Sequence, residues 1–301
     1  MSVIDTLAWF QPEIGPRLKP SIKSVFRQWS GLTSEELESH LHRIVGSELP
    51  NTSNLNLPLY HALLTVRPLQ REQAWPLGEF PCIGLWMFLL PGIAAFPQFP
   101  TILETAHRRR AKILDLGCGL GQDLRLLAAR GVTTDRMWAL DIEPHLWTLG
   151  YELFRDEGRM QALFIHADFL KVNIADDDRF SPLRGQVDLV LASQFLHLFD
   201  WDGQLAANKR IVGLSKPGTM LVGFQQGRKR ARSYIRPWGM MFYHNRESFL
   251  QLWALIQQQT DTQWTVDVSA VPLQDWGMQD EDLEWMPEDR MGINFVITRD
   301  S

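Results

Sequence analysis

The sequence predicts an α/β protein with a seven-stranded, mostly parallel sheet, preceded by a mostly helical region. From Lys112 onward, apolar strand-like runs alternate with helical segments, an order typical of parallel strands joined by crossover helices. The chain ends with two runs rich in β-branched residues, at 264–273 and 293–300, as an antiparallel last strand requires. Residues 1–105 lack this alternation and are expected to be mostly helical.

Each expected element follows from its apolar pattern and its boundary residues. Short apolar runs bounded by turn residues predict strands, and apolar residues at helical spacing, closed by glycine or polar residues, predict helices. The expected strands are 111–117, 136–142, 162–169, 186–194, 216–226, 264–273 and 293–300, and the expected helices are 122–131, 145–158, 199–215 and 246–259.

Two regions are expected: a helical cap over residues 1–105, which would contribute to the substrate region, and a main domain over residues 106–301. In the cap, residues 34–44 have acidic side chains in the first turn and apolar ones at helical spacing, so a helix is predicted there. Residues 80–100 are strongly apolar but too rich in proline to form one regular element. In the main domain, the basic residues 227–236 predict a loop.

Composition limits the class of protein. With 301 residues, 45% hydrophobic and 22% charged, the chain is that of a soluble protein with a sizeable core. The net charge of −5 argues against a nucleic-acid partner. Two cysteines, Cys82 and Cys118, are too few for a disulfide framework or a zinc cluster, which fits a reducing, cytoplasmic location.

Neither a membrane span nor a metal site is expected. The longest apolar stretch, residues 83–96, is interrupted by glycine and proline and is too short to cross a bilayer. His40 and His42 lie two positions apart, so on a helix they point in different directions. The sequence leaves open whether the protein forms a homodimer.

The stretch ILDLGCGLGQDL contains a glycine loop that excludes two common nucleotide motifs. The dinucleotide fingerprint G-x-G-x-x-G would require a third glycine where Gln122 or Leu124 stands. The phosphate loop fails because no lysine follows the glycines. What remains is an acidic residue followed by alternating glycines, which let a backbone approach a ligand closely.

Three acidic residues follow three successive strands. Asp115 precedes the glycines, where a carboxylate suits a cationic amino-acid group better than a pyrophosphate. Asp141 ends the second strand and can accept both ribose hydroxyls, and Asp168 ends the third and can accept from an adenine amine. Because the carboxyl ends of parallel strands meet at one sheet edge, we expect the three carboxylates to lie close together. Their expected partners are an amino-acid group, a ribose and an adenine, which are the three parts of S-adenosylmethionine.

This set of residues resembles the class I S-adenosylmethionine-dependent methyltransferases, which have a Rossmann-like sheet. The resemblance implies that the first loop takes the methionine part, the second acid the ribose and the third acid the adenine. The cofactor-binding residues expected on this basis are Asp115, Gly117, Gly119, Gln122, Asp123, Asp141, Ile142, Asp168, Phe169 and Ser193.

His197 follows the fourth strand, with Asp200 and Trp201 behind it, and resembles the general base of small-molecule O-methyltransferases. An imidazole has the intrinsic pKa to take a hydroxyl proton near neutrality. Alternatively, His197 packs, orders the loop or binds substrate, because a carboxylic acid acceptor is already ionised at neutral pH and needs no base.

The flanks show a closer resemblance. FPCIGLWMFL, FPTILE, LGYELFRD, SQFLHLFDWDGQ and KRIVGLSKPGTMLVGFQQG are similar to the fungal methyltransferases of meroterpenoid clusters. That resemblance implies methyl-ester formation on a small, largely apolar polyketide–terpenoid acid in secondary metabolism. Phe80, Trp86 and Trp238 are then candidates for the substrate wall, although simple packing also explains each.

Two further alternatives stay open. The role of the basic run is open; it consists of Arg228, Lys229, Arg230, Arg232 and Arg236. These residues lie either in a solvated loop, or one of the arginines pairs bidentately with a substrate carboxylate. The enzyme could also methylate a phenol or another heteroatom with His197 as base. A different class, a pericyclase or regulatory protein that holds the cofactor without transferring methyl, has the same cofactor signature.

Overall fold

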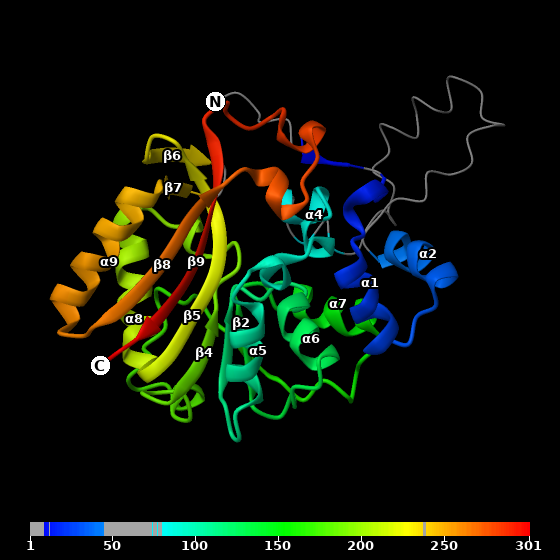
Figure 1. Ribbon diagram of the computed structural model, residues 1–301. Helices are drawn as coiled ribbons and strands as arrows, with labels where there is room; N and C mark the ends of the chain where they lie inside the picture. The colour runs from blue at the N-terminus through cyan, green and yellow to red at the C-terminus, as the bar shows by residue number, and fades with distance from the viewer. Residues whose placement is uncertain (1–8, 12, 45–73, 75–76, 78–79, 237–238) are drawn as a thin grey trace.

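The computed structural model describes residues 9–11, 13–44, 74, 77, 80–236 and 239–301. Its centre is a seven-stranded sheet with the order β3-β2-β1-β4-β5-β9-β8 (Figure 1). The strands are β1 (Ile113–Leu116), β2 (Met137–Asp141), β3 (Leu163–His166), β4 (Val187–Leu191), β5 (Ser215–Arg228), β8 (Trp264–Val271) and β9 (Arg290–Arg299). β1 to β5 pair in parallel, whereas β9 is antiparallel to both β5 and β8. The predicted seven-stranded α/β sheet is confirmed.

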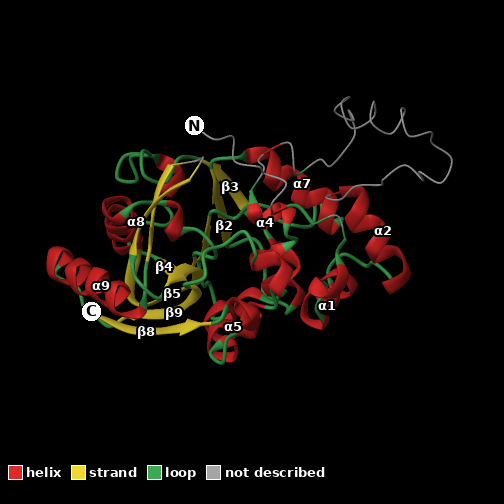
Figure 2. Cartoon of the chain, turned by 90° about the horizontal axis from the view of Figure 1, so that it is seen from above, coloured by secondary structure: helices red, strands yellow, loops and turns green. Residues whose placement is uncertain are grey.

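Helices lie on both sides of this sheet (Figure 2). The α-helices are α1 (Pro20–Gln28), α2 (Ser34–Ile44), α4 (Pro81–Gly84), α5 (Phe99–His107), α6 (Gln122–Ala129), α7 (Pro144–Phe154), α8 (Trp201–Leu214) and α9 (Arg246–Thr260). Short 3₁₀ helices are η2 (Gly15–Arg17), η5 (Met87–Leu89), η6 (Gly92–Ala95), η7 (Asp178–Phe180), η8 (Leu196–Leu198), η9 (Leu273–Trp276) and η10 (Asp280–Leu283). Among the described residues, no helix is long and apolar enough to cross a membrane.

The alternation of side chains along the strands divides the apolar residues between two cores. On β1, Ile113 belongs to the cluster that includes α5, α6, α7 and the cap helices α1 and α2. Leu114 and Leu116 belong to the cluster that includes α8 and α9. Because helices cover both faces, all four residues of β1 are buried.

The described part of the cap follows the sequence prediction closely. The helix expected over residues 34–44 is α2, and residues 80–100 are broken into α4, η5 and η6 before α5 begins at Phe99. α5 crosses the expected boundary between residues 105 and 106, and the cap shares the first core with α6 and α7. The division into two regions therefore stays a prediction.

A third apolar cluster joins the cap to the connection between β8 and β9. It contains Trp9, Leu85, Leu90, Leu273, Trp276, Met278, Leu283 and Met286. Nearby, Arg17 of η2 forms a buried ion pair with Asp282 of η10. The acidic stretch between the last two strands is thus anchored to the N-terminal part of the chain.

The basic stretch 227–236 is not the loop that its charge predicts. It contains the end of β5 and a strand β6 (Arg232–Arg236), which pairs antiparallel with β7 (Gly239–Tyr243). Arg228 is buried, pairs with Asp289 at 2.6 Å and stacks on the Tyr234 ring at 3.6 Å. Cross-strand pairing and these ring and ion contacts outweigh the preference of the arginines for solvent.

Candidate active site

A cavity of about 340 Å³ lies at the carboxyl ends of the parallel strands. The ends of β1, β2, β3 and β4 contribute Gly117, Asp141, Asp168 and Ser193 to its wall. Its other walls come from α4, η5, η8, the hairpin β6–β7 and Trp285. A cavity of this size at this edge of an open α/β sheet is where such folds bind ligands.

The three glycines after β1 adopt left-handed backbone conformations, with φ of +68°, +51° and +72° at Gly117, Gly119 and Gly121. A Cβ atom on Gly117 would lie 2.5 Å from the Phe195 ring, and one on Gly121 would lie 2.3 Å from Arg125 Nη1. At Gly119 a Cβ would meet nothing within 4 Å. Gly119 therefore faces open space, whereas its two neighbours make room for protein side chains.

Asp141 ends β2 and holds the glycine loop in place. One carboxylate oxygen accepts from the Gly119 N–H at 2.8 Å, and the other accepts from the Glu143 N–H at 2.9 Å. Burial raises the pKa of Asp141 in spite of these hydrogen bonds. Beside it, Ile142 lines the cavity with an apolar side chain that is 64% exposed.

Asp168 follows β3 on the same wall, together with the buried Phe169. Its carboxylate accepts from the Leu170 N–H at 3.0 Å and pairs with Lys171 Nζ at 3.0 Å. Partial burial acts to raise the pKa of Asp168, but the bonds from Lys171 and Leu170 outweigh it and the pKa is lowered. Asp168 is therefore a charged hydrogen-bond acceptor at neutral pH.

Asp115 and Asp123 differ from the expectation, because neither lines the cavity and both are buried. Burial, reinforced by the carboxyl groups of Asp123 and Asp141, raises the pKa of Asp115 well above its usual range. Burial also raises the pKa of Asp123 to about 6, and its Oδ2 atom has no hydrogen-bond partner among the described residues. Within that part of the chain, none of the three carboxyl groups has an ion-pair partner.

This arrangement of donors and acceptors fits S-adenosylmethionine. Its cationic ammonium and sulfonium groups match three neighbouring carboxyl groups that lack a counter-charge. The open space at Gly119 allows the close approach of a ligand. Gln122, at the start of α6, also lines the cavity beside the loop.

His197 lies in η8, is buried and lines the cavity. Its ring stacks on the Tyr243 ring with centroids 6.2 Å apart, and its Nδ1 atom has no hydrogen-bond partner in the described chain. Burial, reinforced by the nearby Arg236 guanidinium, lowers the pKa of His197 to about 3. Asp200 does not orient this imidazole: it caps α8 by accepting from the Gly203 N–H at 2.8 Å.

The three aromatic wall candidates have different positions. Phe80 lines the cavity. Trp86 does not: it is 2% exposed, packs near Phe88, and donates its indole N–H to the Gln11 carbonyl at 2.7 Å. Trp86 is therefore a core residue: its large apolar ring is buried in the cap, and its indole N–H has a hydrogen-bond partner there. Trp238 lies outside the described residues.

Three cavity residues come from distant parts of the C-terminal half. Arg236 ends β6, Tyr243 ends β7, and Trp285 lies in the acidic connection before β9. Arg236 Nε donates to the Tyr243 hydroxyl at 3.2 Å, and its guanidinium lies 5.4 Å from the Trp285 ring centroid. The sequence contains a weak signal for Arg236 in the basic run, but none for Tyr243 or Trp285.

Comparisons with known proteins identify methyltransferases as relatives of this chain. A family described as a methyltransferase domain matches residues 113–218. The O-methyltransferase phiE of a fungal species (strain ATCC 74256) is 33% identical over 243 residues, covering 76% of this chain and 80% of the relative. The asnovolin E/chermesin D methyltransferase nvfJ of Aspergillus novofumigatus is 29% identical and covers 83% and 81%.

Among solved structures, the chain is similar to the 1,6-didemethyltoxoflavin-N1-methyltransferase of Burkholderia thailandensis, crystallised with S-adenosylhomocysteine. The identity is 18%, the TM-score is 0.47, and the match covers 69% of this chain and 79% of that one. On the sequence comparisons, the chain belongs to the family of S-adenosylmethionine-dependent methyltransferases that includes the fungal O-methyltransferases.

Proposed function

We propose that this methyltransferase methylates a carboxylate oxygen of a small, largely apolar acid, a polyketide–terpenoid intermediate of secondary metabolism. The observation that carries the proposal is Arg236, a cation on the wall of a mainly apolar cavity. Support for the substrate class comes from the relative nvfJ, whose name says that it acts on asnovolin E and chermesin D. The methyl-ester product would be a neutral, more apolar molecule.

The cofactor site uses the strand ends. When bound, S-adenosylmethionine supplies an electrophilic methyl group on a positively charged sulfur. Asp141 would accept from the ribose, Asp168 would accept from the adenine amine, and Ile142 and Phe169 would contact the adenine. Gly117, Gly119, Gln122 and Ser193 would border the methionine part, and the buried carboxyl groups of Asp115 and Asp123 would offset its positive charge.

Arg236 is placed to hold the acceptor carboxylate. Its guanidinium lies near the rings of Trp285 and Tyr243, and its Nε atom donates to the Tyr243 hydroxyl. No carboxylate of the described chain pairs with it. An arginine that lies against rings, and whose Nη atoms donate to no group of the described residues, suits a bidentate bond to a substrate carboxylate. The apolar walls, which include Met87 and Phe88, suit the body of such a substrate.

His197 supports a carboxylate over a phenol as acceptor. With a pKa of about 3, the imidazole is neutral at pH 7 and is a weak base for a hydroxyl proton. A carboxylate needs no base: its oxygen forms the new O–CH₃ bond while the S–CH₃ bond breaks and the electron pair stays on sulfur. The products are a methyl ester and S-adenosylhomocysteine, and no proton moves. The protein contributes proximity and alignment.

Removing the Arg236 charge tests this proposal. Arg236→Gln should raise KM for a prenylated aromatic acid roughly 10- to 100-fold, the scale of a lost charged hydrogen bond, and leave the affinity for S-adenosylmethionine unchanged. The matched control is Arg232→Gln, on the same strand but exposed and outside the cavity. Product formation is followed by mass spectrometry.

A comparison of acceptors separates the two O-methyltransferase alternatives. If Arg236→Gln keeps its wild-type KM, and the matching phenol without the carboxyl group is methylated as fast as the acid, the carboxylate proposal fails. In that case His197→Ala should abolish turnover. Our proposal instead predicts that His197→Ala retains turnover of the acid, because no proton is removed.

A further inference from the structure

The guanidinium of Arg125 on α6 is inside the protein, where it binds a single carboxylate. Arg125 and Asp156 form two parallel hydrogen bonds, Nε to Oδ2 at 2.8 Å and Nη2 to Oδ1 at 3.0 Å, and both side chains are 0% exposed. Asp156 follows the C-terminus of α7. The rings of Trp147, Tyr151 and Phe154 lie within 5.5 Å of the guanidinium carbon. A buried bidentate pair of this kind has little freedom to move.

The same guanidinium also holds the glycine loop. Its third nitrogen, Nη1, donates to the Leu120 carbonyl at 2.8 Å and to the Gly121 carbonyl at 3.4 Å. The lack of side chains at Gly121 and Gly150 makes this possible, because a Cβ on either would lie within 3.0 Å of Nη1. The backbone at Leu120, which borders the cavity, is thus held by Arg125, whose own side chain does not line the cavity.

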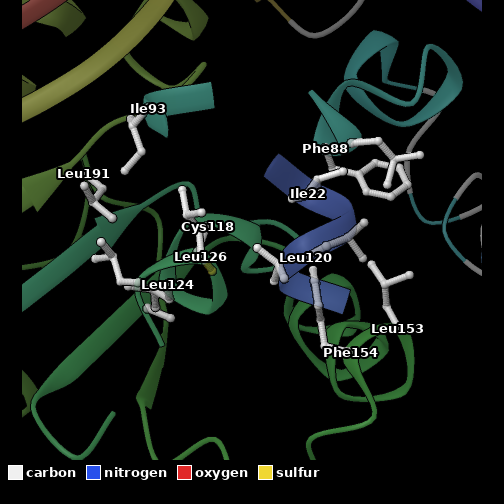
Figure 3. Packing of buried hydrophobic residues seen from close by; sticks show 14 of the residues in the cluster. Ile22, Phe88, Ile93, Cys118, Leu120, Leu124, Leu126, Leu153, Phe154 and Leu191 are labelled. Carbon is white, nitrogen blue, oxygen red and sulfur yellow. The ribbon is translucent and has the colours of Figure 1, made fainter. Parts of the chain in front are cut away.

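The cap completes this network through Trp29, which ends α1. Its indole N–H donates to Asp156 Oδ2 at 2.7 Å, the same oxygen that binds Arg125 Nε. Arg159 stacks on the Trp29 ring at 4.2 Å and donates to the Trp29 carbonyl. Figure 3 shows the apolar contacts around this network: Ile22 of α1, Leu120 of the glycine loop and Phe154 of α7 lie in one cluster.

We propose that Trp29, Asp156 and Arg125 are positioning residues through which docking of the N-terminal cap sets the affinity of the glycine loop for S-adenosylmethionine. The physical reason is that one buried carboxylate is shared by the cap and by the arginine that holds the loop. Without the indole donor, Asp156 Oδ2 loses one of its two partners, and the guanidinium loses a fixed counter-ion. Because coupling is reciprocal, cofactor binding should also stabilise the docked cap.

The experiment measures binding instead of turnover, with S-adenosylhomocysteine as the probe. Trp29→Phe keeps a ring at this half-buried position but removes the donor, and should weaken binding about tenfold in calorimetric titration, within the usual range of coupling between sites. Trp264→Phe is the matched control. Trp264 is on strand β8, and the substitution removes its indole hydrogen bond of 2.9 Å to the Thr262 hydroxyl. It should bind like the wild type.

Amide hydrogen exchange gives a second readout that general destabilisation would not reproduce. In the free protein, Trp29→Phe should speed exchange at residues 117–121 but not in β8. In the wild type, S-adenosylhomocysteine should slow exchange in α1. The inference is contradicted if Trp29→Phe binds S-adenosylhomocysteine as tightly as the wild type does. It is also contradicted if S-adenosylhomocysteine leaves amide exchange in α1 of the wild type unchanged. Because this second measurement uses the wild type, it decides the question even if Trp29→Phe fails to fold.

The inference rests on the assignment of the glycine loop to the cofactor, and a third variant tests that assignment separately. Asp141→Ala should reduce S-adenosylhomocysteine affinity strongly. If it does while Trp29→Phe does not, only the role of the cap is wrong. If Asp141→Ala binds normally, the cofactor-site assignment itself is wrong.

Discussion

Under the proposed assignment of the cofactor site, Asp123 would serve binding at the expense of stability. Its folded pKa of about 6 lies above the model-peptide value of about 3.9, so the free folded protein holds this proton more tightly than the unfolded chain does. The stabilising effect is therefore fully present below about pH 4 and is lost as the pH rises through about 6. At neutral pH the charged carboxylate would suit a cationic ligand, but it lowers the free energy of unfolding and so destabilises the fold.

Asp123→Asn should separate these two effects. At about pH 8 the variant should be more stable to urea than the wild type, on the order of 2 kcal/mol, because it carries no buried charge. Its affinity for S-adenosylmethionine should be lower and should lack the rise that we expect for the wild type between about pH 5 and 7. Asp202→Asn, at an exposed position on α8, removes the same charge outside the site and serves as the control. Equal cofactor affinity in Asp123→Asn and wild type would contradict the role of this carboxyl group.

The positions of cavity residues could be predicted where the local sequence pattern fixes them. They could not be predicted for residues that come together only through the tertiary fold. Asp141 and Asp168 stand directly after strands, so their position at the sheet edge follows from the strand pattern. Arg236 and Trp285 are 49 positions apart and meet only through the hairpin and the connection before β9. The sequence leaves open whether Trp86 lines the pocket or packs in the core, because the local sequence is the same in both cases; the structure places it in the core.

At the scale of elements, the glycine loop has two functions that the alternating pattern does not distinguish. The sequence assigns Gly117 and Gly119 to the cofactor, but of these two only Gly119 faces open space, and Gly121 makes room for Arg125 and Trp147. The charge of the basic stretch 227–236 predicts a loop, but this stretch contains the end of β5 and the strand β6. The pairing of β6 with β7 depends on cross-strand contacts, and Arg228 at the end of β5 pairs with Asp289; no local pattern reveals either interaction.

Alanine at two of these glycines should therefore affect different properties. Gly121→Ala places a Cβ 2.3 Å from Arg125 Nη1 and should destabilise the fold by roughly 2–5 kcal/mol through overpacking and left-handed strain. Gly119→Ala has only the backbone strain, about 1–2 kcal/mol, but should reduce cofactor affinity because its methyl group points into open space beside the cavity. Urea unfolding and calorimetric titration measure the two effects. The opposite pattern would mean that Gly121 contacts the ligand and Gly119 does not.

At the scale of the whole molecule, the seven-stranded sheet and its antiparallel last strand could be predicted, because the signal of each strand and helix is local and periodic. The order of the strands could not be predicted in the same way, because it depends on which strands pair in space. The acceptor side could not be predicted to the same extent. It is assembled from the cap, the hairpin and the connection before β9, which are held together by long-range contacts such as the buried pair of Arg17 and Asp282.

This division explains why the cofactor is established while the acceptor is a proposal. In our proposal the donor half of the cavity is the part lined by the sheet, and the acceptor half is the part lined by the surrounding segments. The most direct test is to supply the enzyme with S-adenosylmethionine carrying a ¹³C-methyl group and a mixture of prenylated aromatic acids, and then to treat the isolated product with mild alkali. Our account predicts that hydrolysis releases labelled methanol and regenerates the free acid. A label that stays on the product through hydrolysis, as in an aryl ether or an N-methyl group, would contradict it.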